Sequence, residues 1–167
     1  PSGGTEGAEL EALLAAEHVT YRAVRVTGSI RVNISLTEPD GTATKINALG
    51  PTLSDEESDR LLSAVVDASG DAVWVLGSGR LPRGVGETFY ARLGEAARQC
   101  GARFALDSSG GPLLAGLRAR PDVIKPNAEE LAQAVGRPLA TFGDTVAAAR
   151  DLGQLGAAAI VVSMGSD

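Results

Sequence analysis

Residues 122–136 read DVIKPNAEELAQAVG, a stretch that runs from a short apolar strand through a turn into a helix. The segment 122–125 carries β-branched residues, and Pro126 biases Lys125 toward extended backbone. Asn127 is a good N-cap for the helix expected over 127–136. The stretch therefore predicts one complete strand-to-helix step, with Lys125 at the end of the strand.

The same alternation continues on both sides of this stretch. Strand-like apolar runs occupy 72–76, 103–106, 122–125 and 158–163. Helical patterns occupy 86–100, 111–120, 127–136 and 141–156. Regular alternation of strand and helix favours right-handed crossovers and a parallel sheet that is covered on both faces. Trp74, inside the first apolar run, is expected in the core.

The first third of the chain has a different pattern. A short helix is expected over 6–17, and the residues from 20 to 49 favour strands. Strands over 20–26 and 30–37, separated by Thr27-Gly28-Ser29, predict a hairpin, and a third strand over 42–49 follows a turn at 38–41. We expect a small antiparallel sheet here. A capping box, Ser54 to Glu57, then begins the next helix.

Composition excludes several classes of protein. The chain has 167 residues and a formal net charge of −6, which disfavours a nucleic-acid binder. A single cysteine and a single histidine exclude a disulfide framework and His-pair metal motifs. No apolar stretch is long enough to span a membrane, and the first residues are not a signal peptide, so we expect a cytoplasmic protein. Because the chain begins at Pro1, we expect a piece of a longer protein.

Polar, glycine-rich loops follow the predicted strands. They occupy 77–84, 107–111, 125–130 and 163–167. Ligands of open parallel sheets bind beyond the carboxyl ends of the strands, so these loops predict a cleft for an anion or a nucleotide.

Two familiar motifs are missing. Pro82 occupies the last glycine position of a dinucleotide fingerprint, which disfavours an oxidoreductase, and no Walker-type phosphate loop is present.

The residue chemistry alone leaves alternatives at individual positions. Asn127 and Glu130 could hold Mg²⁺ through its waters, or they could form an ordinary helix cap. Asp107 could lie near phosphates, or it could make an Asx turn with Ser109. Arg31 could bind an anion or simply point into solvent.

Several segments, in order, resemble the ribokinase-like (PfkB) carbohydrate kinases. KPNAEEL is similar to K-P-N-x-x-E-L, SGRLPRG to S-G-S-L-P-x-G, FALDSSGGPL to D-x-S-G, and IVVSMGSD to the start of S-L-G-x-x-G. Upstream, GSIRVNISLTEPDG and INALGPTLS resemble the lid strands of the sugar-phosphate branch, which includes the 1-phosphofructokinases and tagatose-6-phosphate kinases. The resemblance implies a ribokinase-like α/β fold, incomplete at both ends. Its β lid would be 18–50, and its partial core 1–17 and 51–167.

The resemblance also implies roles for individual residues. The residues that would bind the substrate are Arg31, Asn33, Ser78, Gly79 and Arg80. The residues that would bind the nucleotide are Lys125, Asn127, Ser163 and Gly165. Glu130 and Asn127 would hold Mg²⁺ through water. Asp107 would lie near the phosphates. Arg80 replaces the family's serine, so it either adds positive charge near the sugar phosphate or points to solvent.

The function implied is ATP-dependent phosphoryl transfer to a primary hydroxyl of a sugar phosphate, with ATP and Mg²⁺ as cofactors. The family's G-A-G-D segment, which supplies the catalytic aspartate, is not in residues 1–167, and Asp167 is not in its context. We therefore expect residues 1–167 alone to be inactive. A homodimer through the lid is expected, without nucleic-acid or membrane partners. The alternative is a non-catalytic α/β module that binds a nucleotide or a sugar phosphate.

Overall fold

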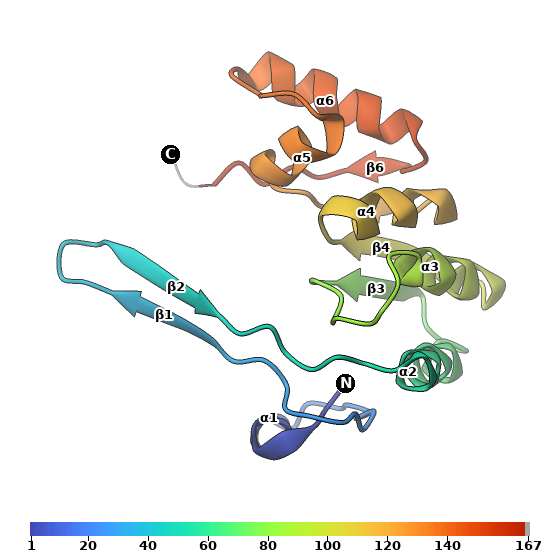
Figure 1. Ribbon diagram of the computed structural model, residues 1–167. Coiled ribbons are helices and arrows are strands. Elements are labelled where there is room, and N and C mark those ends of the chain that lie inside the picture. Colours follow the sequence, from blue (N-terminus) through green and yellow to red (C-terminus); the bar gives the residue numbers. More distant parts are fainter. Residues whose placement is uncertain (166–167) are drawn as a thin grey trace. The chain divides into compact units, whose positions relative to one another are not determined.

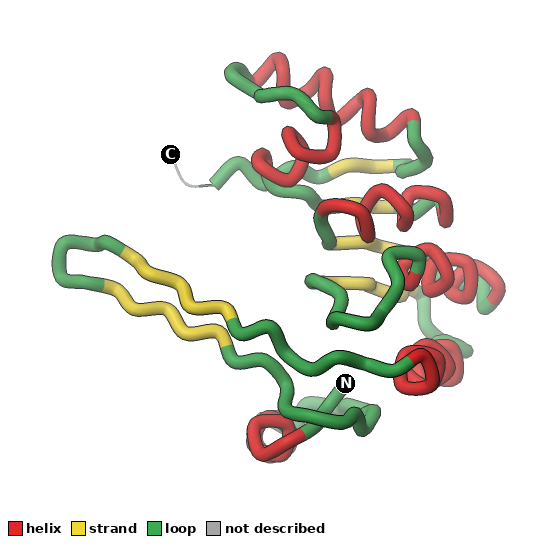
Figure 2. The backbone as a smooth tube through the Cα atoms, in the orientation of Figure 1, coloured by secondary structure: helices red, strands yellow, loops and turns green. Residues whose placement is uncertain are grey.

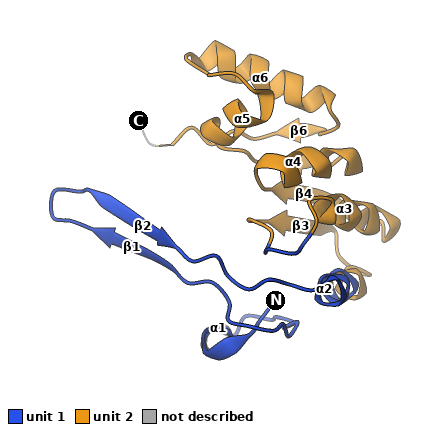
Figure 3. Cartoon of the chain, viewed as in Figure 1, with its two compact units in different colours: residues 1–64, 82–85 blue, residues 65–81, 86–167 orange. Residues whose placement is uncertain are grey.

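The computed structural model describes residues 1–165, and the chain folds as two compact units (Figure 3). The first contains Pro1–Ala64 and Pro82–Val85. The second contains Val65–Leu81 and the described residues from Gly86 onward. The resemblance to the family's nucleotide loop extends to Asp167, which lies outside the described residues. Within those residues, no helix is both long and apolar enough to cross a membrane.

The first unit is built around a β-hairpin. It contains α1 (Gly4–Ala16), β1 (Asn33–Thr37), β2 (Ala43–Asn47) and most of α2 (Asp55–Ala68). The strands β1 and β2 pair antiparallel, with Ile34 opposite Ile46. The predicted turn at 38–41 joins them, since the Gly41 N–H donates to the Glu38 carbonyl at 2.9 Å. Figure 1 shows this hairpin as two long arrows.

The hairpin predicted between 20–26 and 30–37 is wrong. Residues 20–26 form no strand and make only an isolated bridge, in which Arg25 pairs with Ser2. Ser2 donates to the Val24 carbonyl at 2.8 Å and accepts from the Val26 N–H at 3.0 Å. A β-carbon on Gly3 would lie 2.5 Å from the Val26 carbonyl oxygen. The N-terminal residues thus occupy the place expected for a partner strand, because Gly3 allows close backbone approach.

The same contacts join α1 to this unit. Glu11 of α1 forms an ion pair with Arg25 at 2.9 Å.

The predicted capping box at the start of α2 is confirmed: the Glu57 N–H donates to Ser54 Oγ at 3.2 Å, and the Ser54 N–H donates to Glu57 Oε2 at 2.9 Å. The division into a lid (18–50) and a core (1–17 with 51–167) stays a prediction.

The second unit contains the predicted parallel sheet. Its order is β3-β4-β5-β6, and each neighbouring pair is parallel. The strands are β3 (Trp74–Ser78), β4 (Arg103–Asp107), β5 (Val123–Ile124) and β6 (Ala159–Ile160). The helices are α3 (Phe89–Gln99), α4 (Gly110–Gly116), the 3₁₀ turn η1 (Leu117–Ala119), α5 (Ala128–Val135) and α6 (Phe142–Gln154). The strand-helix alternation predicted from the sequence is confirmed, as Figure 2 shows.

The core lies on one face of this sheet. Phe104 and Leu106 of β4 are 3% and 1% exposed, and Ile124 of β5 is fully buried. Leu93 of α3 and Leu113 of α4 are buried in the same core. Burying each large apolar side chain contributes about 1.5–3 kcal/mol. The close packing of α3 depends on a glycine, because a β-carbon on Gly94 would lie 2.6 Å from the Phe104 ring.

The other face of the sheet is not covered by the described residues of the second unit. Trp74 and Leu76 of β3 are 43% and 63% exposed, and Val161 beyond β6 is 54% exposed. Strand alternation places these side chains opposite the Phe104 face. The prediction of a core position for Trp74 is therefore wrong: its ring lies against the Arg103 guanidinium, 5.5 Å from the ring centroid. The sheet predicted to be covered on both faces is covered on one by the described residues of the second unit.

Candidate phosphate-binding edge

The carboxyl ends of the four parallel strands bring most of the predicted site residues to one edge of the second unit. Ser78 ends β3 and pairs in register with Asp107, which ends β4. Lys125 follows β5 directly. Ser163 follows β6 and forms a parallel bridge with Asn127. We call this edge, from Ser78 to Ser163, the candidate phosphate-binding edge.

An ion pair joins two residues of the edge. Lys125 Nζ lies 3.3 Å from Asp107 Oδ2, and the side chains are 48% and 33% exposed. An exposed pair of this kind contributes at most about 1 kcal/mol, so a stronger anion can displace the carboxylate from the ammonium group. The alternative Asx turn of Asp107 with Ser109 is not observed. Asp107 contacts Lys125 instead.

Backbone hydrogen bonds hold Ser163 beside the start of α5. The Ser163 N–H donates to the Pro126 carbonyl at 3.1 Å, and the Ala128 N–H donates to the Ser163 carbonyl at 3.1 Å. Pro126 itself is fully buried, whereas Ser163 is exposed. The backbone of Ser163 is thus fixed, and its hydroxyl stays on the surface. Gly165, two residues on, has a φ of 81°, a left-handed conformation that suits glycine.

Asn127 and Glu130 form a capping box at the N-terminus of α5. The Glu130 N–H donates to Asn127 Oδ1 at 2.8 Å, and the Asn127 N–H donates to Glu130 Oε2 at 2.9 Å. The interpretation of Asn127 and Glu130 as a helix cap is therefore confirmed. It leaves the Asn127 amide group and the second Glu130 oxygen available to a ligand.

The oxygen atoms at this edge suit a magnesium ion only if they contact it through its bound waters. The described residues contain no group of three or more His, Cys, Asp or Glu side chains that could hold a metal ion. Glu130 offers one carboxylate oxygen outside the capping box, and Asp107 is paired with Lys125. Mg²⁺ keeps several waters and needs few protein ligands, so Glu130 and Asn127 suit the outer side of such an ion.

The loop after β3 carries the next three predicted residues. The Gly79 N–H donates to the Asp107 carbonyl at 2.8 Å, which fastens this loop to the loop after β4. The φ of Gly79 is 95°, so the turn requires glycine. Ser78 and Arg80 are exposed. Tyr90 and Ser108, which the sequence did not single out, also contact Gly79.

Arg31 and Asn33 lie in the first unit. Both are exposed; Asn33 is the first residue of β1, and Arg31 precedes that strand by two residues. The structure adds Arg83, whose Nη2 donates to the Gly50 carbonyl at 3.2 Å. Gly50 also lies next to the Arg31 side chain, since a β-carbon there would be 3.2 Å from Arg31 Cβ. Two arginines thus flank Gly50, a juxtaposition that no local sequence signal indicates.

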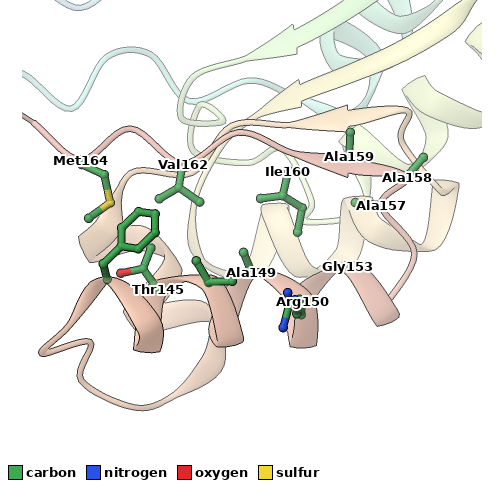
Figure 4. A pocket seen from close by; sticks show the side chains of 12 residues that line it. Thr145, Ala149, Arg150, Gly153, Ala157, Ala158, Ala159, Ile160, Val162 and Met164 are labelled. Atoms are coloured by element: carbon green, nitrogen blue, oxygen red, sulfur yellow. The ribbon is translucent and has the colours of Figure 1, made fainter.

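A hollow of about 480 Å³ lies elsewhere, along α6 and β6 (Figure 4). Its wall is mostly apolar and includes Phe142, Val162 and Met164. None of the predicted site residues lines it. Ser163 lies between Val162 and Met164 in the sequence, but it does not line the hollow.

The fold of the second unit is that of an α/β protein whose candidate residues lie beyond the carboxyl ends of parallel strands, where ligands of such sheets bind. The comparison with known proteins makes this more specific. Residues 2–167 match the pfkB family of carbohydrate kinases. The chain belongs to this family, as the ordered motifs indicated.

The chain is similar to enzymes that act on phosphorylated fructose. It is 36% identical to the 1-phosphofructokinase of Rhodobacter capsulatus over 98% of this chain and 54% of that protein. It is 32% identical to the 1-phosphofructokinase of Bacillus subtilis over 99% of this chain and 54% of that protein. The chain spans about half the length of the curated relatives it matches.

Solved structures agree with the fold. Phosphofructokinase-2 from Escherichia coli in complex with fructose-6-phosphate is 33% identical, with a TM-score of 0.85 over 99% of this chain and 55% of that one. The tetrameric inhibited form of the same enzyme has a TM-score of 0.86 at 32% identity, over 99% of this chain and 55% of that one. The ribokinase of Arabidopsis thaliana, at 21% identity, shares the fold. The predicted ribokinase-like fold is confirmed.

Proposed function

We propose that the protein, at its natural length, is an ATP-dependent kinase that phosphorylates a primary hydroxyl of a sugar phosphate similar to fructose 1-phosphate. The observation that carries the proposal is the common edge of Asp107, Lys125, Asn127 and Ser163 in a chain similar to 1-phosphofructokinases. The catalytic aspartate would lie outside residues 1–167. Because ATP and sugar phosphates are cytoplasmic metabolites, the proposal also places the protein there.

Each residue of the edge has a task in this reaction. Lys125 exchanges its partner, Asp107, for an oxygen of the nucleotide's phosphate chain, because the chain carries more negative charge in total than one carboxylate. The Ser163 hydroxyl, fixed by its backbone, donates a further hydrogen bond to the nucleotide. Mg²⁺, when bound, neutralises charge on the phosphates, and the free oxygen of Glu130 accepts hydrogen bonds from its waters. Catalysis then rests on positioning and on charge neutralisation.

The sugar phosphate is assigned to Arg31 and Asn33, with Ser78, Gly79 and Arg80 as further substrate contacts. A guanidinium group binds a phosphate through two parallel hydrogen bonds, which fixes both position and orientation. Arg31 is exposed, so its guanidinium group is accessible to a ligand. Asn33, the first residue of β1, can donate and accept hydrogen bonds with sugar hydroxyls.

Steady-state kinetics of the natural-length protein test the proposal. The parent should phosphorylate fructose 1-phosphate with MgATP, and Arg31→Ala should raise KM for the sugar phosphate by about tenfold or more, with KM for ATP unchanged. Arg22→Ala is the matched control, because Arg22 is an exposed arginine of the same unit whose side chain donates to the Ala64 carbonyl at 3.3 Å. Equal sugar-phosphate KM values for Arg31→Ala and the parent would refute the role of Arg31. Binding without turnover would favour the non-catalytic alternative.

We also propose that the apolar face of the hairpin joins two copies of the protein. Ile34 and Ile46 face each other across the strands and are 49% and 52% exposed; Leu36 on the same face is 55% exposed. An exposed apolar sheet face of this kind favours association. In sedimentation experiments, Ile34→Lys should convert a dimer to a monomer, whereas Ser35→Lys on the opposite face should not. A parent that sediments as a monomer contradicts the proposal.

A further inference from the structure

The carbonyl oxygen of Gly79 accepts hydrogen bonds from two side-chain hydroxyl groups. Tyr90 Oη donates at 2.9 Å, and Ser108 Oγ donates at 3.1 Å. The Gly79 N–H donates to the Asp107 carbonyl at 2.8 Å. Both backbone groups of Gly79 are therefore bonded, and α3 and the loop after β4 together fix its orientation.

The two donors are themselves held rigidly. Tyr90 is 5% exposed and Ser108 is 6% exposed. The Tyr90 ring packs directly on β3, since a β-carbon on Gly77 would lie 2.8 Å from the ring. The Phe89 ring meets Tyr90 edge-on at a centroid distance of 5.9 Å. Burial, with the charge of Asp107, raises the pKa of Tyr90, so its hydroxyl stays protonated and can donate near neutral pH.

The fixed carbonyl determines the direction of the next N–H group. No cis peptide occurs in the described residues, so the Gly79 carbonyl and the Arg80 N–H lie in one peptide plane and point in opposite directions within it. Because the carbonyl faces Tyr90 and Ser108, the Arg80 N–H faces away from them. Within residues 1–165, the Arg80 N–H donates to no backbone carbonyl, and Arg80 is exposed. The Arg80 N–H is thus a hydrogen-bond donor with a fixed direction, close to Ser78 at the candidate phosphate-binding edge.

We infer that Tyr90 and Ser108 are positioning residues that aim the Arg80 backbone N–H at an oxygen of the bound sugar phosphate. The inference rests on the proposed function, since it deepens the role of the loop 78–80. It also gives Arg80 a task that its side chain does not supply. A backbone donor remains when serine is replaced by arginine at position 80, so the replacement leaves this contact intact.

Substitutions of the two hydroxyl donors in the natural-length protein test this. We expect Tyr90→Phe with Ser108→Ala to raise KM for fructose 1-phosphate about tenfold, while KM for ATP changes less than twofold. Tyr90→Phe combined with Ser108→Thr, which keeps one hydroxyl, should recover most of the loss. Tyr21→Phe is the matched control, because Tyr21 is 41% exposed and lies in the first unit. Amide hydrogen exchange of Gly79 provides a readout that does not depend on activity.

The outcomes separate this inference from the proposed function. Faster exchange at Gly79, a selective rise in the sugar-phosphate KM and recovery by threonine support the inference. Unchanged Gly79 exchange in the double variant overturns it, and so does an equal rise in both KM values. No turnover by the parent, with faster Gly79 exchange in the double variant, refutes the proposed function but supports the role of the hydroxyls in holding the peptide.

Discussion

Glu130→Gln separates the two tasks assigned to Glu130, because glutamine can keep the capping box but carries no charge. The side chain accepts from the Asn127 N–H at 2.9 Å, and a glutamine carbonyl can do the same. Only the interaction of a negative carboxylate with the waters of Mg²⁺ would be lost. Loss of such an outer contact lowers metal affinity by about tenfold to hundredfold. We therefore expect the Mg²⁺ concentration for half-maximal activity to rise by about tenfold.

The stability cost of the same substitution should be small. Losing the interaction of the charge with the α5 dipole costs about 0.3–1 kcal/mol, or roughly 1–4 °C in Tm for a chain of this size. Glu129→Gln is the matched control: it removes a charge from the same first turn, but Glu129 is outside the capping box. Mg²⁺ titrations of the kinase rate and thermal unfolding of both variants provide the comparison. Equal Mg²⁺ dependence in the two variants would show that Glu130 serves only as a helix cap.

Three further predictions concern the fold. Gly77→Ala should lower the free energy of unfolding by about 1–3 kcal/mol, because its β-carbon would lie 2.8 Å from the Tyr90 ring. Gly86→Ala is the control in urea unfolding, because a β-carbon there meets nothing within 4 Å. Equal unfolding midpoints for the two variants would contradict the packing of Tyr90 on Gly77. In residues 1–167, acrylamide should readily quench Trp74, the single tryptophan, and strong protection would contradict the open sheet face. Hydrogen bonds from the Ser54 and Thr27 N–H groups lower the pKa of Glu57, so its stabilisation is present above its ordinary pKa of 4.5 and lost as pH falls through the lower folded value. Urea unfolding at pH 7 and pH 3 should then show a smaller loss of stability on acidification for Glu57→Gln than for the parent, and equal losses would contradict this.

Local signals predicted much of the second unit. Pro126, Asn127 and Gly136 lie in a short stretch whose backbone preferences agree with one another, and α5 begins and ends as they indicate. In the first unit, Ser54 and Glu57 likewise form the capping box that their spacing predicts. Because parallel strands end at a common edge, the meeting of Asp107 with Lys125 follows from topology.

Contacts distant in sequence could not be predicted in the same way. Nothing local indicates that residues 24–26 pair with Ser2 rather than with a hairpin partner. Trp74 lies in an apolar run typical of a doubly covered strand, and only the structure shows which face the helices cover. Tyr90 resembles any core aromatic in the sequence, since its contact with Gly79 depends on how α3 packs on β3.

A crystal structure of the natural-length protein with MgADP and fructose 1-phosphate tests the central claim most directly. The account predicts nucleotide phosphates within hydrogen-bond distance of Lys125, Asn127 and Ser163, with the sugar phosphate on Arg31. A nucleotide seated in the hollow along α6 and β6, with Lys125 still paired to Asp107 and Arg31 in solvent, would contradict it.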